Sequence, residues 1–350
     1  MFEISGKDII SLGDSDLRSL VAGLAIAELR TKGYPRSSVT AGGNQDAADG
    51  GLDVRVECPS DFTDPDFVPR RLTGFQVKKP DMRASAIREE MRPKGRLRDV
   101  IRELANASGA YVIVSSQGSI ADKPLADRRR AMRTALKDIP GAAQLHMDFY
   151  DRDRLSTWVN EYPGIAAWVR GRVGRPLSGW SGIGDWDGGG ACAPKPFLSN
   201  EKACVIDERS CEREYVTIPE GISRMRAGLR TPKKCIRLIG LSGVGKTRLV
   251  QALFEDGVGE DPLDSSIAVY TDYSTETDPT ARDMVRNLVA IDSGLFSSWT
   301  IAILPPILNL HAFARVRPAR LASSPLNMTF ATTSLNKPKC SVFSQHLPNS

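Results

Sequence analysis

Three polar residues on two predicted strands could together carry out metal-assisted chemistry. Asp53 lies in a stretch of alternating apolar and polar residues over 52–56, and Gln76 and Lys78 lie in a second such stretch over 74–78. Because side chains two residues apart on a strand share a face, Gln76 and Lys78 point the same way. If the strands pair, Asp53 lies beside both. The set could hold Mg²⁺ and stabilise charge on a phosphate under attack, although spacing alone leaves open a surface hairpin with incidental polar residues.

The trio resembles the active site of the Mrr-like branch of the PD-(D/E)XK restriction endonucleases. In that family an Asp after a Gly-Gly-x turn precedes a Gln-x-Lys strand, here Asp53, Gln76 and Lys78. The resemblance implies an α/β sandwich around a central mixed sheet. It also implies that Asp53 and the Gln76 side-chain oxygen bind Mg²⁺, while Lys78 orients or activates the attacking water. Many relatives have Glu or Asp where Gln76 stands, so this site carries less negative charge.

An acidic residue that is predicted to face the core is a further candidate for this site. The residues over 14–31 predict a helix whose apolar stripe is Leu17, Leu20, Val21 and Leu24, and Glu28 continues that stripe. An acid in such a position is costly unless it is paired or binds a cation. In Mrr-like relatives a helical Glu before the first strand can approach the metal, so Glu28 is a candidate. The alternative is an ordinary acid at the end of a helix.

A contiguous phosphate-binding motif lies in the second half of the chain. Residues 240–247 (GLSGVGKT) match GxxxxGK[ST], follow a predicted strand over 235–239 and open a predicted helix over 246–254. Lys246 would reach the β- and γ-phosphates of ATP, and Thr247 would ligate Mg²⁺. The backbone N–H groups of the loop would cradle the phosphates; the loop residues concerned are Gly240, Ser242, Gly243, Val244 and Gly245.

The order of these segments resembles bacterial antiphage proteins that fuse a nuclease effector to a STAND-class NTPase. This resemblance divides the chain into a nuclease-like domain over 1–172, a Gly/Pro-rich linker over 173–215, an incomplete P-loop NTPase domain over 216–290 and a tail over 291–350. A full-length form could assemble as a homo-oligomer. Because the NTPase domain is incomplete, we expect weak or no binding of ATP and doubt its ATPase activity.

The composition changes abruptly at the tail. Charged residues fall from 83 in the first 290 residues to 6 in the last 60. We expect the tail to be translated out of frame and disordered. In a shifted frame the last base of the Trp299 codon and the first two bases of the Thr300 codon read GAC. That codon specifies Asp, the residue expected after the next buried strand of a P-loop NTPase.

Composition bounds the class of protein. Of the 350 residues 41% are hydrophobic and 25% are charged, no apolar run reaches membrane length, and no signal-peptide pattern begins the chain. The six cysteines are scattered and predict reduced thiols and a cytoplasmic location with no membrane partner. The three histidines make histidine-based catalysis an unfavourable hypothesis.

Positive charge is concentrated locally, in a manner suited to DNA. Residues 70–102 contain eleven Lys and Arg against four Asp and Glu, and a second basic cluster lies over 128–133. Such clusters suit a phosphate backbone, although solvated helix faces would also explain many of these charges. The leading hypothesis is a Mg²⁺-dependent DNA endonuclease with an attached ATP-binding signalling module for antiphage defence. The alternatives are an ATP-binding regulator that only binds DNA, or an inert frameshifted fragment.

Overall fold

The chain forms two compact units, Met1–Leu177 and Ser178–Ser350. The computed structural model describes residues 3–41, 52–63, 66–118, 122–137, 139–182, 204–207, 214–231, 234–240, 245–272, 276–284, 300–304, 328–334 and 337–341. Among these residues, no helix combines the length and the apolar character that crossing a bilayer requires.

The first unit is α/β, with a central mixed sheet of five strands in the order β1-β2-β3-β4-β5. β1 and β2 are antiparallel, as are β2 and β3, whereas β3, β4 and β5 run parallel. The strands are β1 (Val39–Ala41), β2 (Val54–Glu57), β3 (Leu72–Lys78), β4 (Ala110–Ser115) and β5 (His146–Tyr150). The expected mixed sheet is therefore confirmed.

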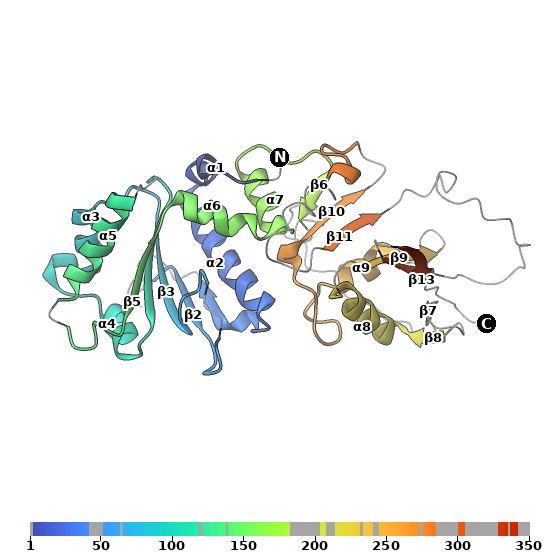
Figure 1. Ribbon diagram of the computed structural model, residues 1–350, viewed down its shortest axis with the longest axis horizontal. Coiled ribbons are helices and arrows are strands. Elements are labelled where there is room, and N and C mark those ends of the chain that lie inside the picture. Colours follow the sequence, from blue (N-terminus) through green and yellow to red (C-terminus); the bar gives the residue numbers. More distant parts are fainter. Residues whose placement is uncertain are drawn as a thin grey trace, which may run out of the picture. The chain divides into compact units, whose positions relative to one another are not determined.

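Helices cover both faces of this sheet (Figure 1). On one face lie α3 (Ala84–Met91), α4 (Asp99–Asn106) and α5 (Asp122–Ala135). On the other lie α2 (Asp14–Thr31), α6 (Arg152–Asn160) and α7 (Pro163–Arg172), and α1 (Gly6–Ser11) packs on α6 and α7. The parallel crossovers from β3 to β4 and from β4 to β5 place α3, α4 and α5 on the same face, because such crossovers share one handedness.

Several local features follow from sequence as predicted. α2 spans the predicted residues and ends before Gly33, whose φ of +84° is the left-handed conformation that glycine adopts without strain. Pro93–Gly95 forms a short 3₁₀ turn between α3 and α4, because proline and glycine both interrupt a helix. Trp158 is fully buried and stacks on Phe67 with a centroid distance of 5.1 Å, so it belongs to the core.

The register of β2 against β3 determines which side chains meet. Val54 lies opposite Phe75, and Arg55 lies opposite Gly74. One residue before β2, the backbone N–H of Asp53 donates to the carbonyl of Phe75 at 3.0 Å. Asp53 and Gln76 are therefore neighbours on one face of the sheet, as the strand pairing predicts.

The second unit contains two further sheets. One has the order β11-β10-β6, and the other has the order β13-β12-β7-β8 with β9 also paired to β12. The strands are β6 (Trp180–Gly182), β7 (Cys204–Asp207), β8 (Glu214–Thr217), β9 (Lys234–Gly240), β10 (Ala268–Asp272), β11 (Thr300–Leu304), β12 (Met328–Ser334) and β13 (Lys337–Ser341). α8 (Ile218–Leu229) and α9 (Lys246–Ala252) share a core with β7 and β8.

Three expectations for this part of the chain need correction. The region 173–215 is not only a linker, because the buried Trp180 donates from Nε1 to the Pro279 carbonyl and β6 pairs with β10. β9 and β10 do not share a P-loop-type sheet, since β9 is antiparallel to β12 and β10 lies in the other sheet. The expectation of a disordered tail does not hold for β11, β12 and β13, which are strands, and β11 pairs in parallel with β10.

Candidate functional site

Asp53 and Gln76 are joined directly at the junction of β2 and β3. Oδ2 of Asp53 accepts a hydrogen bond from Nε2 of Gln76 at 2.8 Å and another from the backbone N–H of Val77 at 2.7 Å. These two bonds fix the carboxylate over the carboxyl-terminal part of β3. The structure thus brings together the first two of the three predicted residues.

The remaining atom of the Gln76 amide is the most informative feature of the site. Gln76 is 4% exposed, and its Oε1 is buried without a hydrogen-bond partner among the described residues. A buried carbonyl oxygen without a partner costs about 1–3 kcal/mol. Such an oxygen and a carboxylate oxygen can together coordinate a hard cation such as Mg²⁺. A half-turn of the amide would bring Oε1 to Asp53, so Asp53 and Gln76 fit a shared Mg²⁺.

Lys78 lies on the same face but has a partner that the sequence did not predict. Its Nζ lies 3.1 Å from Oε2 of Glu90 on α3, and Oε1 of Glu90 accepts from Nη2 of Arg98 at 2.9 Å. The Glu90 side chain is only 14% exposed. The ammonium of Lys78 is therefore held beside the Asp53–Gln76 pair by a carboxylate that is itself anchored.

Arg18 is the second unpredicted member of the site. Its Nε lies 2.9 Å from Oδ1 of Asp53, and its Nη2 contacts Oδ2 of Asp14 one turn earlier on α2. Burial raises the pKa of Asp53, whereas the Val77 N–H, Arg18 and Lys78 lower it. The effect of burial is the larger one, so the net shift of the Asp53 pKa is upward.

A buried tyrosine hydroxyl lies near the same charges. Tyr111 on β4 is in register with Gly74 and is fully buried, and its hydroxyl has no hydrogen-bond partner among the described residues. Burial raises the pKa of Tyr111 far above its ordinary value, and the charges of Glu90 and Asp53 raise it further. Tyr111 therefore stays a neutral hydroxyl that can donate or accept one hydrogen bond here.

Glu28 is buried, but no described contact brings it to the trio. Its Oε1 accepts from the Val68 backbone N–H at 3.1 Å and lies 3.0 Å from Nζ of Lys32. Arg18, which does reach Asp53, lies ten residues earlier on α2, about 15 Å along the helix axis. Burial raises the pKa of Glu28, and Lys32 partly offsets this. Oε1 of Glu28 thus holds the segment around Val68, whereas its Oε2 is buried without a hydrogen-bond partner among the described residues. The metal-site role of Glu28 stays a prediction.

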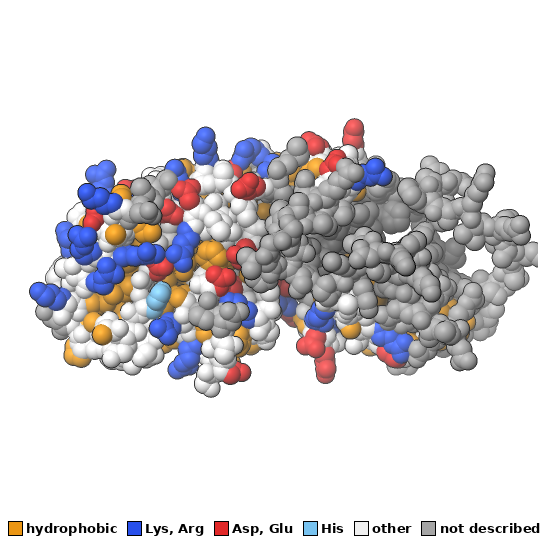
Figure 2. Space-filling model, viewed as in Figure 1, with side chains coloured by type: hydrophobic (Ala, Val, Ile, Leu, Met, Phe, Trp, Pro, Cys, Tyr) orange, Lys and Arg blue, Asp and Glu red, His pale blue; other side chains and the backbone are white. Residues whose placement is uncertain are grey.

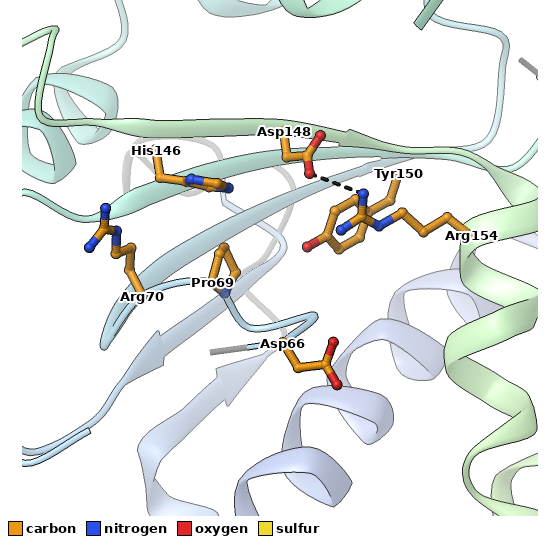
Figure 3. Close-up of a pocket in the computed structure, with 7 residues that line it drawn as sticks. All are labelled: Asp66, Pro69, Arg70, His146, Asp148, Tyr150 and Arg154. Atoms are coloured by element: carbon orange, nitrogen blue, oxygen red, sulfur yellow. Dashed lines mark ion pairs between the residues drawn. The ribbon is translucent and has the colours of Figure 1, made fainter. Parts of the chain in front are cut away.

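A second polar cleft lies on the opposite face of the sheet. Its volume is about 340 Å³, and its lining residues are Asp66, Pro69, Arg70, His146, Asp148, Tyr150 and Arg154 (Figure 3). Asp148 is in register with Val112 of β4 and thus with Phe75 of β3, which faces away from Gln76. Its carboxylate is occupied, because Arg129 contacts Oδ1 at 2.7 Å and Arg154 contacts Oδ2 at 3.2 Å. This cleft is separate from the Asp53 site.

The basic residues predicted to contact DNA are partly neutralised. Figure 2 shows Lys and Arg side chains gathered toward the end of the first unit that carries α3 and α5. Within 70–102 and 128–133, ion pairs join Arg96 and Arg102 to Asp99, Arg128 to Asp81, and Arg129 to Asp148. Exposed basic residues in the same ranges are Arg70, Arg71, Arg83, Arg88, Lys94, Arg96, Arg102, Arg130 and Arg133, of which Arg83, Arg96, Arg102 and Arg130 also form ion pairs.

The phosphate-binding motif is described only at its two ends. β9 ends at Gly240, and Gly245 has a left-handed φ of +86° immediately before α9. Burial lowers the pKa of Lys246, and Thr247 is exposed. The predicted loop residues Ser242, Gly243 and Val244 lie outside the described residues.

Sequence reasoning missed Arg18, Glu90 and Tyr111 because none carries a local signal. Asp14 and Arg18 form an (i, i+4) pair that is ordinary on a helix surface. Glu90 and Tyr111 reach the site only through the packing of α3 and β4 on β3. In the described part of the chain, no three His, Cys, Asp or Glu side chains form a metal-binding group. A cation at this site would thus rest on Asp53 and the Gln76 amide.

Comparison with known protein families, curated proteins and solved structures found no match to this chain.

Proposed function

We propose that the chain is a metal-dependent DNA endonuclease that hydrolyses phosphodiester bonds. The observation that carries this proposal is the Asp53–Gln76 pair, fixed by strand register, with the buried Oε1 of Gln76 lacking a partner and Lys78 on the same face. The finer fold that fits the proposal is a restriction-endonuclease-like sandwich of the PD-(D/E)XK class. The five-stranded mixed sheet with helices on both faces is compatible with it.

Each residue of the trio has a distinct role in the proposed reaction. Asp53 and Gln76 would hold Mg²⁺, which supplies Lewis-acid polarisation of the phosphate when bound. Lys78, paired with Glu90, places a positive charge beside the reacting phosphate, where negative charge grows in the transition state. Glu90 keeps the ammonium in position and Arg98 keeps Glu90 in position. The attacking water would be oriented by Lys78 and the Asp53 carboxylate.

The proposed substrate follows from the surrounding charge. Exposed Arg and Lys side chains of 70–102 and 128–133 would contact the phosphates of a DNA strand. Such an enzyme would act in the cytoplasm, and its attachment to an ATP-binding signalling module fits a role in defence against bacteriophage.

A second candidate function is an ATP-binding regulator that binds DNA without cleaving it. The observation that favours it is the left-handed Gly245 directly before α9, with Lys246 at the helix start, which is compatible with a phosphate loop that ends there. Lys246 and Thr247 would then contact the phosphates and Mg²⁺ of ATP. The absence of a shared β9–β10 sheet weighs against strong binding.

Plasmid cleavage separates the two candidates. The wild-type chain should nick or linearise supercoiled DNA with Mg²⁺ and not with EDTA, and Asp53→Asn should remove this activity. The matched control is Glu103→Gln, which alters an acid paired with Arg55 away from the trio. DNA binding in EDTA without cleavage in Mg²⁺ would support the regulator instead. Equal cleavage by wild type and Asp53→Asn would refute the proposed site.

A further inference from the structure

Arg18 makes an ion pair at the one carboxylate oxygen of Asp53 that the strands leave open. Oδ2 is occupied by the Val77 N–H and by Gln76, whereas Oδ1 faces Nε of Arg18 at 2.9 Å. This contact is an ion pair and not an aligned hydrogen bond. The Arg18 and Asp53 side chains are 28% and 15% exposed, so the pair lies at the solvent margin of the site. A cation bound by the Asp53 carboxylate and the Gln76 amide would lie close to this guanidinium, and the two positive charges would oppose each other.

Arg18 also has an anchor that does not depend on Asp53. Its Nη2 contacts Oδ2 of Asp14, which lies one turn earlier on the same helix. The guanidinium can therefore leave Asp53 while its other end stays near α2. Guanidinium groups bind phosphate oxygens strongly, because their planar fork can donate two parallel hydrogen bonds.

We infer that Arg18 exchanges the carboxylate of Asp53 for a phosphate of bound DNA, and that this exchange couples cation binding to DNA binding. In the free protein Arg18 rests on Oδ1 and opposes the cation. In the complex it rests on a phosphate, and Oδ1 becomes available. This inference rests on the proposed nuclease function and adds to it a substrate-binding residue that also governs when the cation binds.

The exchange predicts a positive coupling between the two ligands. DNA should raise the affinity for the cation, and the cation should raise the affinity for DNA by the same factor, because coupling free energies are reciprocal. Without Arg18 no guanidinium opposes the cation in the free protein. The cation should therefore bind the free protein more tightly, and DNA should raise its affinity little further.

The test is calorimetric titration of Ca²⁺, which takes oxygen ligands, into the full chain with and without a short DNA duplex. The variants are Arg18→Gln, Arg18→Lys and the control Arg55→Gln, which removes one positive charge from an exposed ion pair with Glu103. Without DNA, Arg18→Gln should bind Ca²⁺ about fivefold more tightly than wild type, the factor that corresponds to ~1 kcal/mol for a partly exposed ion pair. Arg18→Lys should fall between the two, and Arg55→Gln should match wild type.

The decisive quantity is the ratio of Ca²⁺ affinities with and without DNA. A ratio above one in wild type that falls to about one in Arg18→Gln, with Arg55→Gln unchanged, supports the exchange. An equal ratio in wild type and Arg18→Gln overturns it, even if the protein cleaves DNA, and leaves the proposed function standing. If neither wild type nor Arg18→Gln binds Ca²⁺, the proposed cation site and the inference both fall. Circular dichroism confirms that each variant is folded, and Arg18→Lys repeats the test if Arg18→Gln is not.

Discussion

The two candidate phosphate sites of this chain are encoded in different ways. The Asp53 site gathers residues from α2, the start of β2, β3, α3 and β4, which are far apart in sequence. The motif over 240–247 is contiguous and can be read without any knowledge of the fold. Yet the dispersed site lies on a five-stranded sheet with helices on both faces, whereas the strand before the contiguous motif pairs antiparallel with β12.

A motif that is easy to recognise in the sequence is therefore not always the one that the surrounding sheet holds in place. A contiguous loop brings its own backbone donors but needs a surrounding sheet to hold it. A dispersed site has a weaker sequence signal, but strand register determines its geometry once the sheet forms.

The largest effect is expected from removing the positive charge of the dispersed site. Lys78→Ala should lower the rate of Mg²⁺-dependent plasmid cleavage by about 10²–10³-fold, because it removes charge stabilisation from the transition state. The fold should persist by circular dichroism, since Lys78 lies at the end of β3 and is partly exposed. Lys137→Ala alters an exposed lysine and should cleave as wild type does. A folded Lys78→Ala variant with undiminished cleavage would contradict the assignment.

A smaller effect is expected from changing the second proposed cation ligand, Gln76. Gln76→Glu adds a carboxylate beside Asp53 and should tighten Mg²⁺ binding about tenfold, or ~1.4 kcal/mol. Without Mg²⁺ the same variant should be less stable, because the Gln76–Asp53 hydrogen bond is replaced by two like charges. Calorimetry and thermal unfolding with and without Mg²⁺ measure both effects. Gln117→Glu makes the same change at an exposed position, and an equal gain in that variant would argue against a site at Gln76.

The framework of the first unit can be tested by its pH dependence. Burial, with the nearby charges of Asp66 and Glu28, raises the pKa of Glu161 to about 7, and Lys32 lowers it in part. The folded chain therefore binds a proton more tightly than the unfolded chain does, so this group makes stability fall as pH rises between the ordinary glutamate value and about 7. Because Glu161 is partly exposed, we expect a loss of only ~1 kcal/mol.

Glu161→Gln should remove that slope. Urea unfolding at a series of pH values should show wild type losing stability over this range and Glu161→Gln losing less. Glu89→Gln, a change at an exposed acid of α3, should follow wild type. Parallel curves for wild type and Glu161→Gln would show that Glu161 keeps an ordinary proton affinity in the folded chain.

The smallest effect is expected at the contiguous motif. ATP with Mg²⁺ should bind weakly or not at all, and Lys246→Ala should change that binding little, because β9 and β10 do not form one sheet around the loop. Isothermal titration of both proteins measures this. If wild type binds ATP with sub-micromolar affinity and Lys246→Ala abolishes that binding, the motif over 240–247 is held in a binding-competent conformation and this prediction is wrong.

The sequence predicted the first unit well where local rules act alone. The extent of α2, the break at Pro93–Gly95 and the alternation of β2 and β3 follow from periodicity and breaker residues. The pairing of Asp53 with Gln76 then followed from strand geometry. The short strand β1 has no signal in the sequence, because three residues are too few to show a period.

The rest of the site depends on contacts that no local pattern carries. Glu90 lies in a run of charged residues and has no distinguishing sequence signal. It reaches Lys78 only because α3 packs over β3 and β4. Glu28 was chosen for lying on an apolar stripe, but its described partners are Lys32 and the backbone N–H of Val68, forty residues away in sequence, and both meet Oε1. The reading-frame proposal for 291–350 remains a prediction that sequencing the gene would test.

The pairing of Asp53 with Gln76 also limits which insertions and deletions the gene can tolerate. One added residue between Asp53 and Val54 would turn Asp53 to the opposite side of the sheet, because side chains alternate along a strand. The same added residue in the exposed part of the connection, over 60–63 and before the buried Phe67 and Val68, would leave the strand register unchanged and cost little loop entropy. We therefore expect length variation among functional variants to concentrate in that connection and to be absent from 53–57 and 72–78.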